Sequence, residues 1–186
     1  MQLKSQWRSP ETLLMLMAIG MPLSFATWTG LLNNYAIEMI NFDGREMGFL
    51  QSFREVPGFL SFAVVFAMLF MRQQPLTLLA LLLLGAGTAL TGFFPSFWGL
   101  MITTFIMSIG FHYFETLHQS LTLQWIDKHR TPVVFGRIIS LRSIASAIVF
   151  GLIYLALELG GFAYILVYLV AGCITISIAF FCWSAY

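Results

Sequence analysis

Charged residues are scarce in this sequence, since only 9% of its 186 residues are Asp, Glu, Lys or Arg. Soluble domains carry about 25% charged residues, so a chain this poor in charge cannot cover a globule with a hydrated surface. Hydrophobic residues make up 59% of the chain, and the mean hydropathy is +0.87. These values predict an integral membrane protein without a soluble domain.

Basic tracts and a disulfide framework are also missing. Nine Lys and Arg residues against eight Asp and Glu residues leave a formal net charge of +1, which excludes a nucleic-acid-binding surface. The two cysteines, Cys173 and Cys182, are nine residues apart in one apolar run and fall on opposite faces of a helix. They therefore predict no disulfide, and we expect no cofactor.

Six long apolar segments follow one another along the chain, and a spanning helix needs about 20 such residues. They cover about residues 12–40, 47–71, 76–94, 97–125, 133–157 and 162–184. Short polar, Pro-containing or Gly-containing turns separate them. The fold class that we expect is an all-α integral membrane protein, with residues 1–186 forming one six-helix transmembrane domain.

Basic residues near the segment ends indicate an orientation through the positive-inside rule. If the N-terminus is cytoplasmic, Arg45 alone lies outside, and six basic residues lie inside: Lys4, Arg8, Arg72, Lys128, Arg130 and Arg137. This distribution predicts a multi-pass protein of the cell (inner) membrane with both termini in the cytoplasm.

Charged side chains at membrane depth are the candidate functional residues, because each costs about 2.5–3.5 kcal/mol on insertion scales. Segments 76–94 and 162–184 contain none and either face lipid or pack as supports. The other four segments carry polar stripes that include Ser24, Thr27, Asn34, Glu38, Arg54, Glu55, His112, Glu115, His118, Gln119 and Arg142. We expect these four helices to line one aqueous cavity.

The order of the segments repeats after three: a polar helix, a helix with an arginine, then an apolar helix. Because three is odd, the second triplet runs inverted relative to the first, and Arg54 and Arg142 fall at approximately equivalent positions. Within the second triplet, Glu115 lies nine residues, about 14 Å, from Gln124 near the cytoplasmic end of its helix. Arg142 lies about as deep from the same side, so we expect Glu115 and Arg142 to form an ion pair.

Six spans with both ends inside, polar first, second, fourth and fifth helices and inverted triplets resemble the N-terminal half of a major facilitator superfamily transporter. The signature motifs are degenerate. Arg72 stands at the arginine of the loop between helices 2 and 3, with Met71 at the aspartate, and Gly110 alone matches the helix 4 motif. The resemblance implies a second six-helix half, which we expect to be absent by truncation or supplied by a dimer mate.

We therefore expect a secondary transporter, not an enzyme, that moves a small solute across the bilayer by alternating access. The substrate-binding candidates are Arg54, Arg142, Asn34, His112 and Gln119. Glu115 and Glu55 are the candidates for proton coupling, because burial raises the pKa of a carboxyl group and a neighbouring arginine lowers it.

The sequence is also compatible with two other classes of function. Glu115-x-x-His118 matches half of a di-iron motif, and His112 precedes it by one turn, so an intramembrane metal or redox enzyme built on this helix is the alternative. We expect no metal, however, because only Glu38 and Glu55 could complete the ligand set. A structural or assembly subunit is the third class, and it predicts that Arg142 and Glu115 tolerate substitution.

Overall fold

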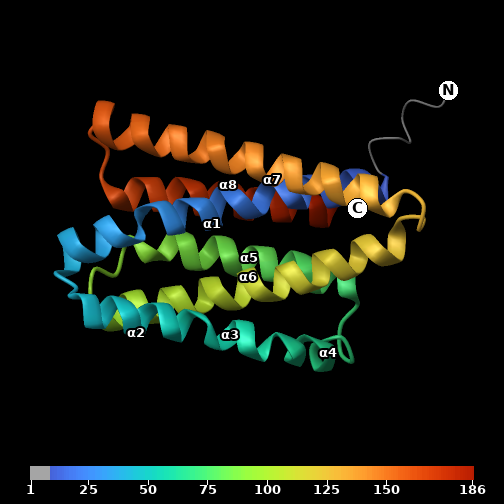
Figure 1. Cartoon of the computed structure of the whole chain (residues 1–186), viewed down its shortest axis with the longest axis horizontal. Helices are drawn as coiled ribbons and strands as arrows, with labels where there is room; N and C mark the ends of the chain where they lie inside the picture. Colours follow the sequence, from blue (N-terminus) through green and yellow to red (C-terminus); the bar gives the residue numbers. More distant parts are fainter. Residues whose placement is uncertain (1–8) are drawn as a thin grey trace.

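The computed structural model describes residues 9–186, and all regular elements in this range are helical. Five helices are long and apolar enough to cross a membrane. They are α1 (Pro10–Ile40), α5 (Gln73–Thr91), α6 (Phe97–Trp125), α7 (Thr131–Tyr154), which continues into a π-helical turn (Leu155–Leu159), and α8 (Tyr164–Ala185). All five run along the long axis of the molecule (Figure 1). The chain is therefore an all-helical, multi-pass membrane protein.

The expected helix over 47–71 is not continuous. Its place is taken by a series of short pieces that runs beside α6 (Figure 1): α2 (Gly44–Arg54), α3 (Val56–Phe59), a 3₁₀ turn (Leu60–Ala63) and α4 (Val64–Ala67). Pro57 lies in the first turn of α3. It has no N–H to donate and its ring crowds the preceding turn, so the helix breaks there.

Local sequence signals account for several helix ends. The Ser9 hydroxyl accepts a hydrogen bond from the Thr12 N–H at 3.1 Å and caps α1. Asp43 and Glu46 form a reciprocal capping box at the start of α2, in which each side chain accepts from the other residue's backbone N–H. Ser96 caps α6 in the same way as Ser9 caps α1, through the Gly99 N–H. The helices therefore begin where their capping residues stand.

Helix α5 lies between α6 and α8, and glycines allow the close approach on both sides. A Cβ atom added to Gly110 of α6 would lie 2.2 Å from the backbone nitrogen of Leu84. A Cβ atom added to Gly172 of α8 would lie 2.4 Å from the carbonyl oxygen of Gly85. Small residues at such crossings permit the dispersion contacts that hold membrane helices together. Of the two roles open for segment 76–94, α5 thus takes the packing role.

The loops are distributed between the two ends of the molecule in the expected way. The start of α1, the Arg72 turn, the loop with Lys128 and Arg130, and the end of α8 lie at one end (Figure 1). Arg45 lies in the first turn of α2 at the other end. Lys4 and Arg8 lie outside the described residues. The side on which the cytoplasm lies stays a prediction.

Candidate functional site

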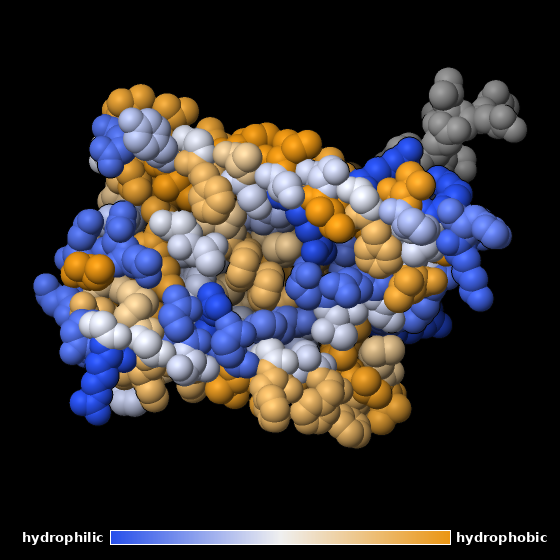
Figure 2. Space-filling model, viewed as in Figure 1, coloured by the Kyte–Doolittle hydropathy of each residue, from blue (hydrophilic) through white to orange (hydrophobic). Residues whose placement is uncertain are grey.

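One charged face is formed by side chains from α2, the α2–α3 junction, α6 and α7, namely those of Arg54, Glu55, His112, Glu115 and Arg142. Hydrophilic side chains cross the middle of the molecule in Figure 2, between apolar surfaces on α7 and on α3 and α4. Arg142 stands at the midpoint of α7, eleven residues from Thr131 and twelve from Tyr154. The charged face therefore lies at the depth where ionised groups are most costly.

The expected ion pair between Glu115 and Arg142 is confirmed. The Nη1 atom of Arg142 lies 2.6 Å from Oε1 of Glu115, and the two side chains are 17% and 26% exposed. The guanidinium carbon also lies 5.8 Å from the ring centroid of Phe114, within the range of a cation–π contact. Sequence depth alone was sufficient to predict this contact because α6 and α7 are antiparallel neighbours in the chain.

His118 holds Arg142 from the other side. The Nε2 atom of this buried histidine lies 2.9 Å from the carbonyl oxygen of Leu14 on α1, and Nδ1 lies 3.1 Å from Nη2 of Arg142. A carbonyl only accepts and a guanidinium only donates, so Nε2 carries the ring proton and Nδ1 is the acceptor. The geometry thus fixes His118 as a neutral tautomer that links α1, α6 and α7.

A second group of charges lies nearer the start of α6. Arg54 forms a salt bridge with the adjacent Glu55, and its Nε donates to Glu55 Oε1 at 3.0 Å. Glu55 Oε2 lies 3.7 Å from Nε2 of His112. The Arg54 guanidinium also lies 5.6 Å from the centroid of the buried Trp28 on α1. Both residues of the Arg54–Glu55 pair therefore also contact side chains of other helices.

Helix α6 connects the two groups. His112, Glu115 and His118 follow one another at a spacing of three residues, which places them on neighbouring turns of one side of the helix. The hydroxyl of Ser108, one turn earlier, donates to the Arg54 carbonyl oxygen at 2.5 Å. A close contact of Gly58 with the His112 ring brings α3 against α6 at the same level. One side of α6 therefore carries a continuous run of polar groups.

The charged face is open rather than enclosed. The side chains of Arg54 and His112 are 23% and 20% exposed, and that of Glu55 is 54% exposed. Asn34 and Gln119 are exposed and make no hydrogen bond with another described residue. The sequence predicted a cavity lined by four helices. In the structure these residues instead form an open surface, which would become a cavity only if another protein surface covered it.

Two members of the expected stripe on α1 do not belong to this face. Ser24 is buried and donates to the Thr175 hydroxyl of α8 at 2.8 Å, so it holds two helices together. Thr27 is also buried, and its hydroxyl donates to the Leu23 carbonyl of its own helix. Asn34 lies six residues before the end of α1, whereas Glu115 lies eighteen residues after the start of α6 at that same end of the molecule. This difference corresponds to an axial offset of about 18 Å.

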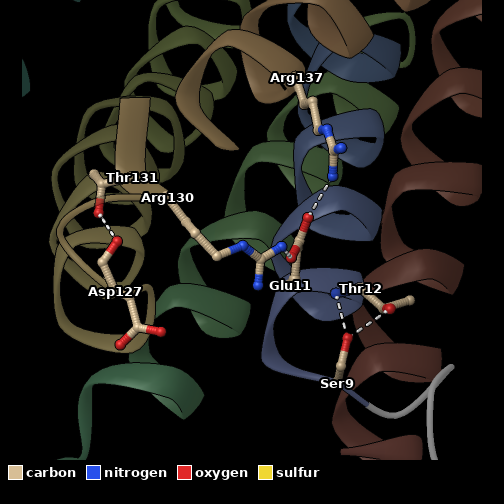
Figure 3. Close-up of polar contacts among 7 residues, drawn as sticks. All are labelled: Ser9, Glu11, Thr12, Asp127, Arg130, Thr131 and Arg137. Atoms are coloured by element: carbon tan, nitrogen blue, oxygen red, sulfur yellow. Dashed lines mark hydrogen bonds and ion pairs between the residues drawn. The ribbon is translucent and has the colours of Figure 1, made fainter. Parts of the chain in front are cut away.

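A charged cluster at the other end of α1 was not predicted. Glu11 accepts from Arg130 at 2.7 Å and from Arg137 at 2.8 Å, and thereby joins α1 to the loop before α7 and to α7 itself (Figure 3). In the same view, Thr131 donates to the Asp127 carbonyl at the start of α7. The sequence did contain a signal for this cluster. Glu11 is an acidic residue in the first turn of α1, at the end of the molecule where most basic residues were expected.

The histidines of α6 do not converge on a metal-binding position. No group of three or more His, Cys, Asp or Glu residues with suitable geometry occurs among residues 9–186. Both ring nitrogens of His118 are occupied by Leu14 and Arg142, so neither offers a free lone pair to a metal ion. His112 lies near Glu55, and Glu115 contacts Arg142, so the three side chains have different partners.

Comparison with known proteins provides no family for this arrangement. No family model, no curated protein and no solved structure matches the chain.

Proposed function

We propose that this chain is one six-helix half of a secondary transporter of major facilitator type, which moves a small solute by alternating access. The observation that carries the proposal is the charged face. Two arginine–carboxylate pairs stand at mid-membrane depth on a surface that stays partly exposed. Hydrocarbon is a poor surrounding for such a surface, so water, a solute or a second protein surface must cover it.

The packing of the helices supports the inverted-triplet arrangement. Helix α1 packs against α7 and α8, whereas α6 packs against α5 and against α2 and α3. In this arrangement α1 corresponds to α6, the α2–α4 series corresponds to α7, and α5 corresponds to α8. The neighbours of α1 in the second triplet, α7 and α8, are then equivalent to the neighbours of α6 in the first triplet. Transporters built from such triplets bind solute between two domains near the bilayer midplane.

The chemistry of the face fits the recognition of a polar solute. Arg54 and Arg142 offer guanidinium donors that match the geometry of carboxylate or phosphate groups. Each arginine is paired with a glutamate, so the face is nearly neutral without solute. His112 lies between the pairs, with Glu55 in contact and Glu115 one turn along the helix. These residues provide both a binding surface and carboxylates that can exchange protons with water.

Site-directed thiol labelling in membranes tests whether the face is wet. In a Cys173→Ala/Cys182→Ala background, we expect Thr116→Cys, an exposed position beside His112 on α6, to react with a charged, membrane-impermeant thiol reagent. Val170→Cys on α8, which is 47% exposed, is the matched control. Its thiol should stay unreactive, because ionisation to the reactive thiolate requires water.

The labelling pattern also separates the proposal from its rivals. Reaction of Thr116→Cys from both sides of the membrane, at rates that differ between inside-out and right-side-out vesicles, supports alternating access. Equal and slow reaction at both positions would show that the charged face is dry, and the transporter assignment would then be wrong.

A further inference from the structure

Building on the proposed transport function, we propose that Arg142 binds the carboxylate of a small monoanionic solute in place of Glu115, and that Glu115 takes up one proton in this exchange. The inference rests on three features of the group formed by Arg142, Glu115 and His118. First, His118 holds Arg142 in place without the help of Glu115. Second, the Arg142 guanidinium has N–H donors that no described residue uses. Third, the charges of Arg142 and ionised Glu115 sum to zero.

The anchor is His118. Its Nε2 donates to the Leu14 carbonyl and its Nδ1 accepts from Arg142, so the ring is held from both sides inside the protein. Loss of the Glu115 contact leaves this support intact. Arg142 would therefore keep its position when its carboxylate partner changes, as a binding residue must.

The spare donors are on the guanidinium itself. Arginine has five N–H groups, and the structure assigns one contact to Glu115 and one to His118. The Nε atom is buried and makes no hydrogen bond with any described residue. An unpaired buried donor is unfavourable, and a carboxylate that binds two guanidinium N–H groups at once would relieve it.

The charges of the group explain why one proton should accompany each bound anion. Arg142 and ionised Glu115 sum to zero, and the neighbouring Arg54 and Glu55 also sum to zero. The titratable and charged groups around Glu115 are His112 and His118 on its own helix, Arg142 on α7, and the Arg54–Glu55 pair at the junction of α2 and α3. Helix α1 contributes the Leu14 carbonyl. A monoanion that entered without a proton would leave one net negative charge at mid-depth, which is costly.

The step is balanced when Glu115 accepts a proton from a hydronium ion or a buffer acid in the surrounding water, which releases that proton. The Arg142–Glu115 ion pair breaks, an O–H bond forms on Glu115, and an Arg142–solute ion pair replaces the first one. No electrons are transferred, and the group returns to zero net charge. A dianion would leave a net charge of −1, so the balance favours small monocarboxylates.

Calorimetry on the purified full chain in detergent tests this exchange, with acetate and lactate as probes. Titrations in buffers of different ionisation enthalpy count the protons, and we expect about one proton per anion. Where one proton is taken up per anion, linkage requires the apparent Kd to rise about tenfold for each unit by which the pH is raised. Glu115→Gln should bind the same anions with no proton uptake and no pH dependence.

Further variants separate binding from folding. Arg142→Lys keeps the charge but loses the planar fork, and we expect at least tenfold weaker binding. His118→Asn retains one donor and one acceptor and should preserve the affinity better than His118→Leu. Glu38→Gln, a carboxylate variant whose hydrogen-bond partner is Tyr164 at the end of the bundle, is the control and should still take up one proton per anion.

Several results would overturn the inference. These are proton uptake that persists in Glu115→Gln, proton uptake that disappears in Glu55→Gln, and an absence of binding for both anions. The outcome is separable from that of thiol labelling. A dry face together with proton-linked anion binding would refute transport alone, whereas a wet face that binds no anion would refute this exchange alone.

Discussion

Arg142 on α7 contacts Glu115 on α6 at 2.6 Å, across two helices that touch little elsewhere. Helix α7 packs instead on α1, and the contacts of Arg142 with Glu115 and His118 close the gap toward α6. A contact of this kind links two helices through charge rather than through apolar packing, so its removal should have a measurable effect on stability.

A double-mutant cycle measures that link. We expect Arg142→Gln and Glu115→Gln each to lower the free energy of unfolding by about 1–3 kcal/mol, less than the 3–5 kcal/mol of a fully buried pair. The double variant should lose less than the sum, with a coupling energy between about 0.5 and 3 kcal/mol. Denaturant unfolding in detergent is the measurement. Arg45→Gln combined with Glu115→Gln is the control and should be additive, and an additive result for the Arg142 pair would contradict the contact.

Close packing at Gly110 predicts a strong effect of a single methyl group. Gly110→Ala places a Cβ atom against the backbone of Leu84, where no side chain can move aside, so α5 and α6 must separate. We expect a loss of about 1–3 kcal/mol, typical of an overpacked core. Gly136→Ala on α7 meets nothing within 4 Å, and it should be neutral or stabilising by up to about 1 kcal/mol. Thermal unfolding of both variants decides the matter, and equal losses would be inconsistent with this packing.

The Glu11 cluster predicts a dependence on salt. Arg130 and Arg137 are about 60% exposed, and exposed ion pairs contribute about 1 kcal/mol or less. Glu11→Gln should therefore lower the Tm slightly at low ionic strength, and the difference should disappear near 1 M salt, where the screening length is about 3 Å. Glu38→Gln is the matched control, because its hydrogen bond to neutral Tyr164 should respond little to salt. A deficit of Glu11→Gln that persists in high salt would exclude an electrostatic origin.

Much of the fold is predictable from the apolar segments and their breaks. The segment 97–125 coincides with α6, whereas the segment 47–71 is divided near Pro57 into short helical pieces. Hydropathy counts apolar residues over the whole segment, whereas the backbone hydrogen bonds fail locally where proline supplies no donor.

Some contacts of the candidate site could likewise be predicted from the sequence, and others could not. Helical periodicity and depth place Glu115 and Arg142 at the same level, so their contact follows from the sequence. Helical periodicity does not predict which neighbouring helix a given face of a helix will contact. Ser24 faces α8 rather than the charged face, and His118 contacts a carbonyl 104 residues away. Such pairings depend on how closely glycines let the helices approach, which no single helix encodes.

The unequal helix lengths have a consequence for the cost of membrane insertion. Helix α1, with 31 residues, is about 46 Å long, and α6, with 29 residues, is about 44 Å long, whereas the hydrocarbon layer is about 30 Å thick. Both helices therefore extend beyond the hydrocarbon layer into the headgroup region. Glu11 and Glu38 lie near the two ends of α1, so their carboxylates are among phosphates and water. The cost of placing ionised groups in hydrocarbon thus falls almost entirely on the few residues midway along α6 and α7 and at the junction of α2 and α3.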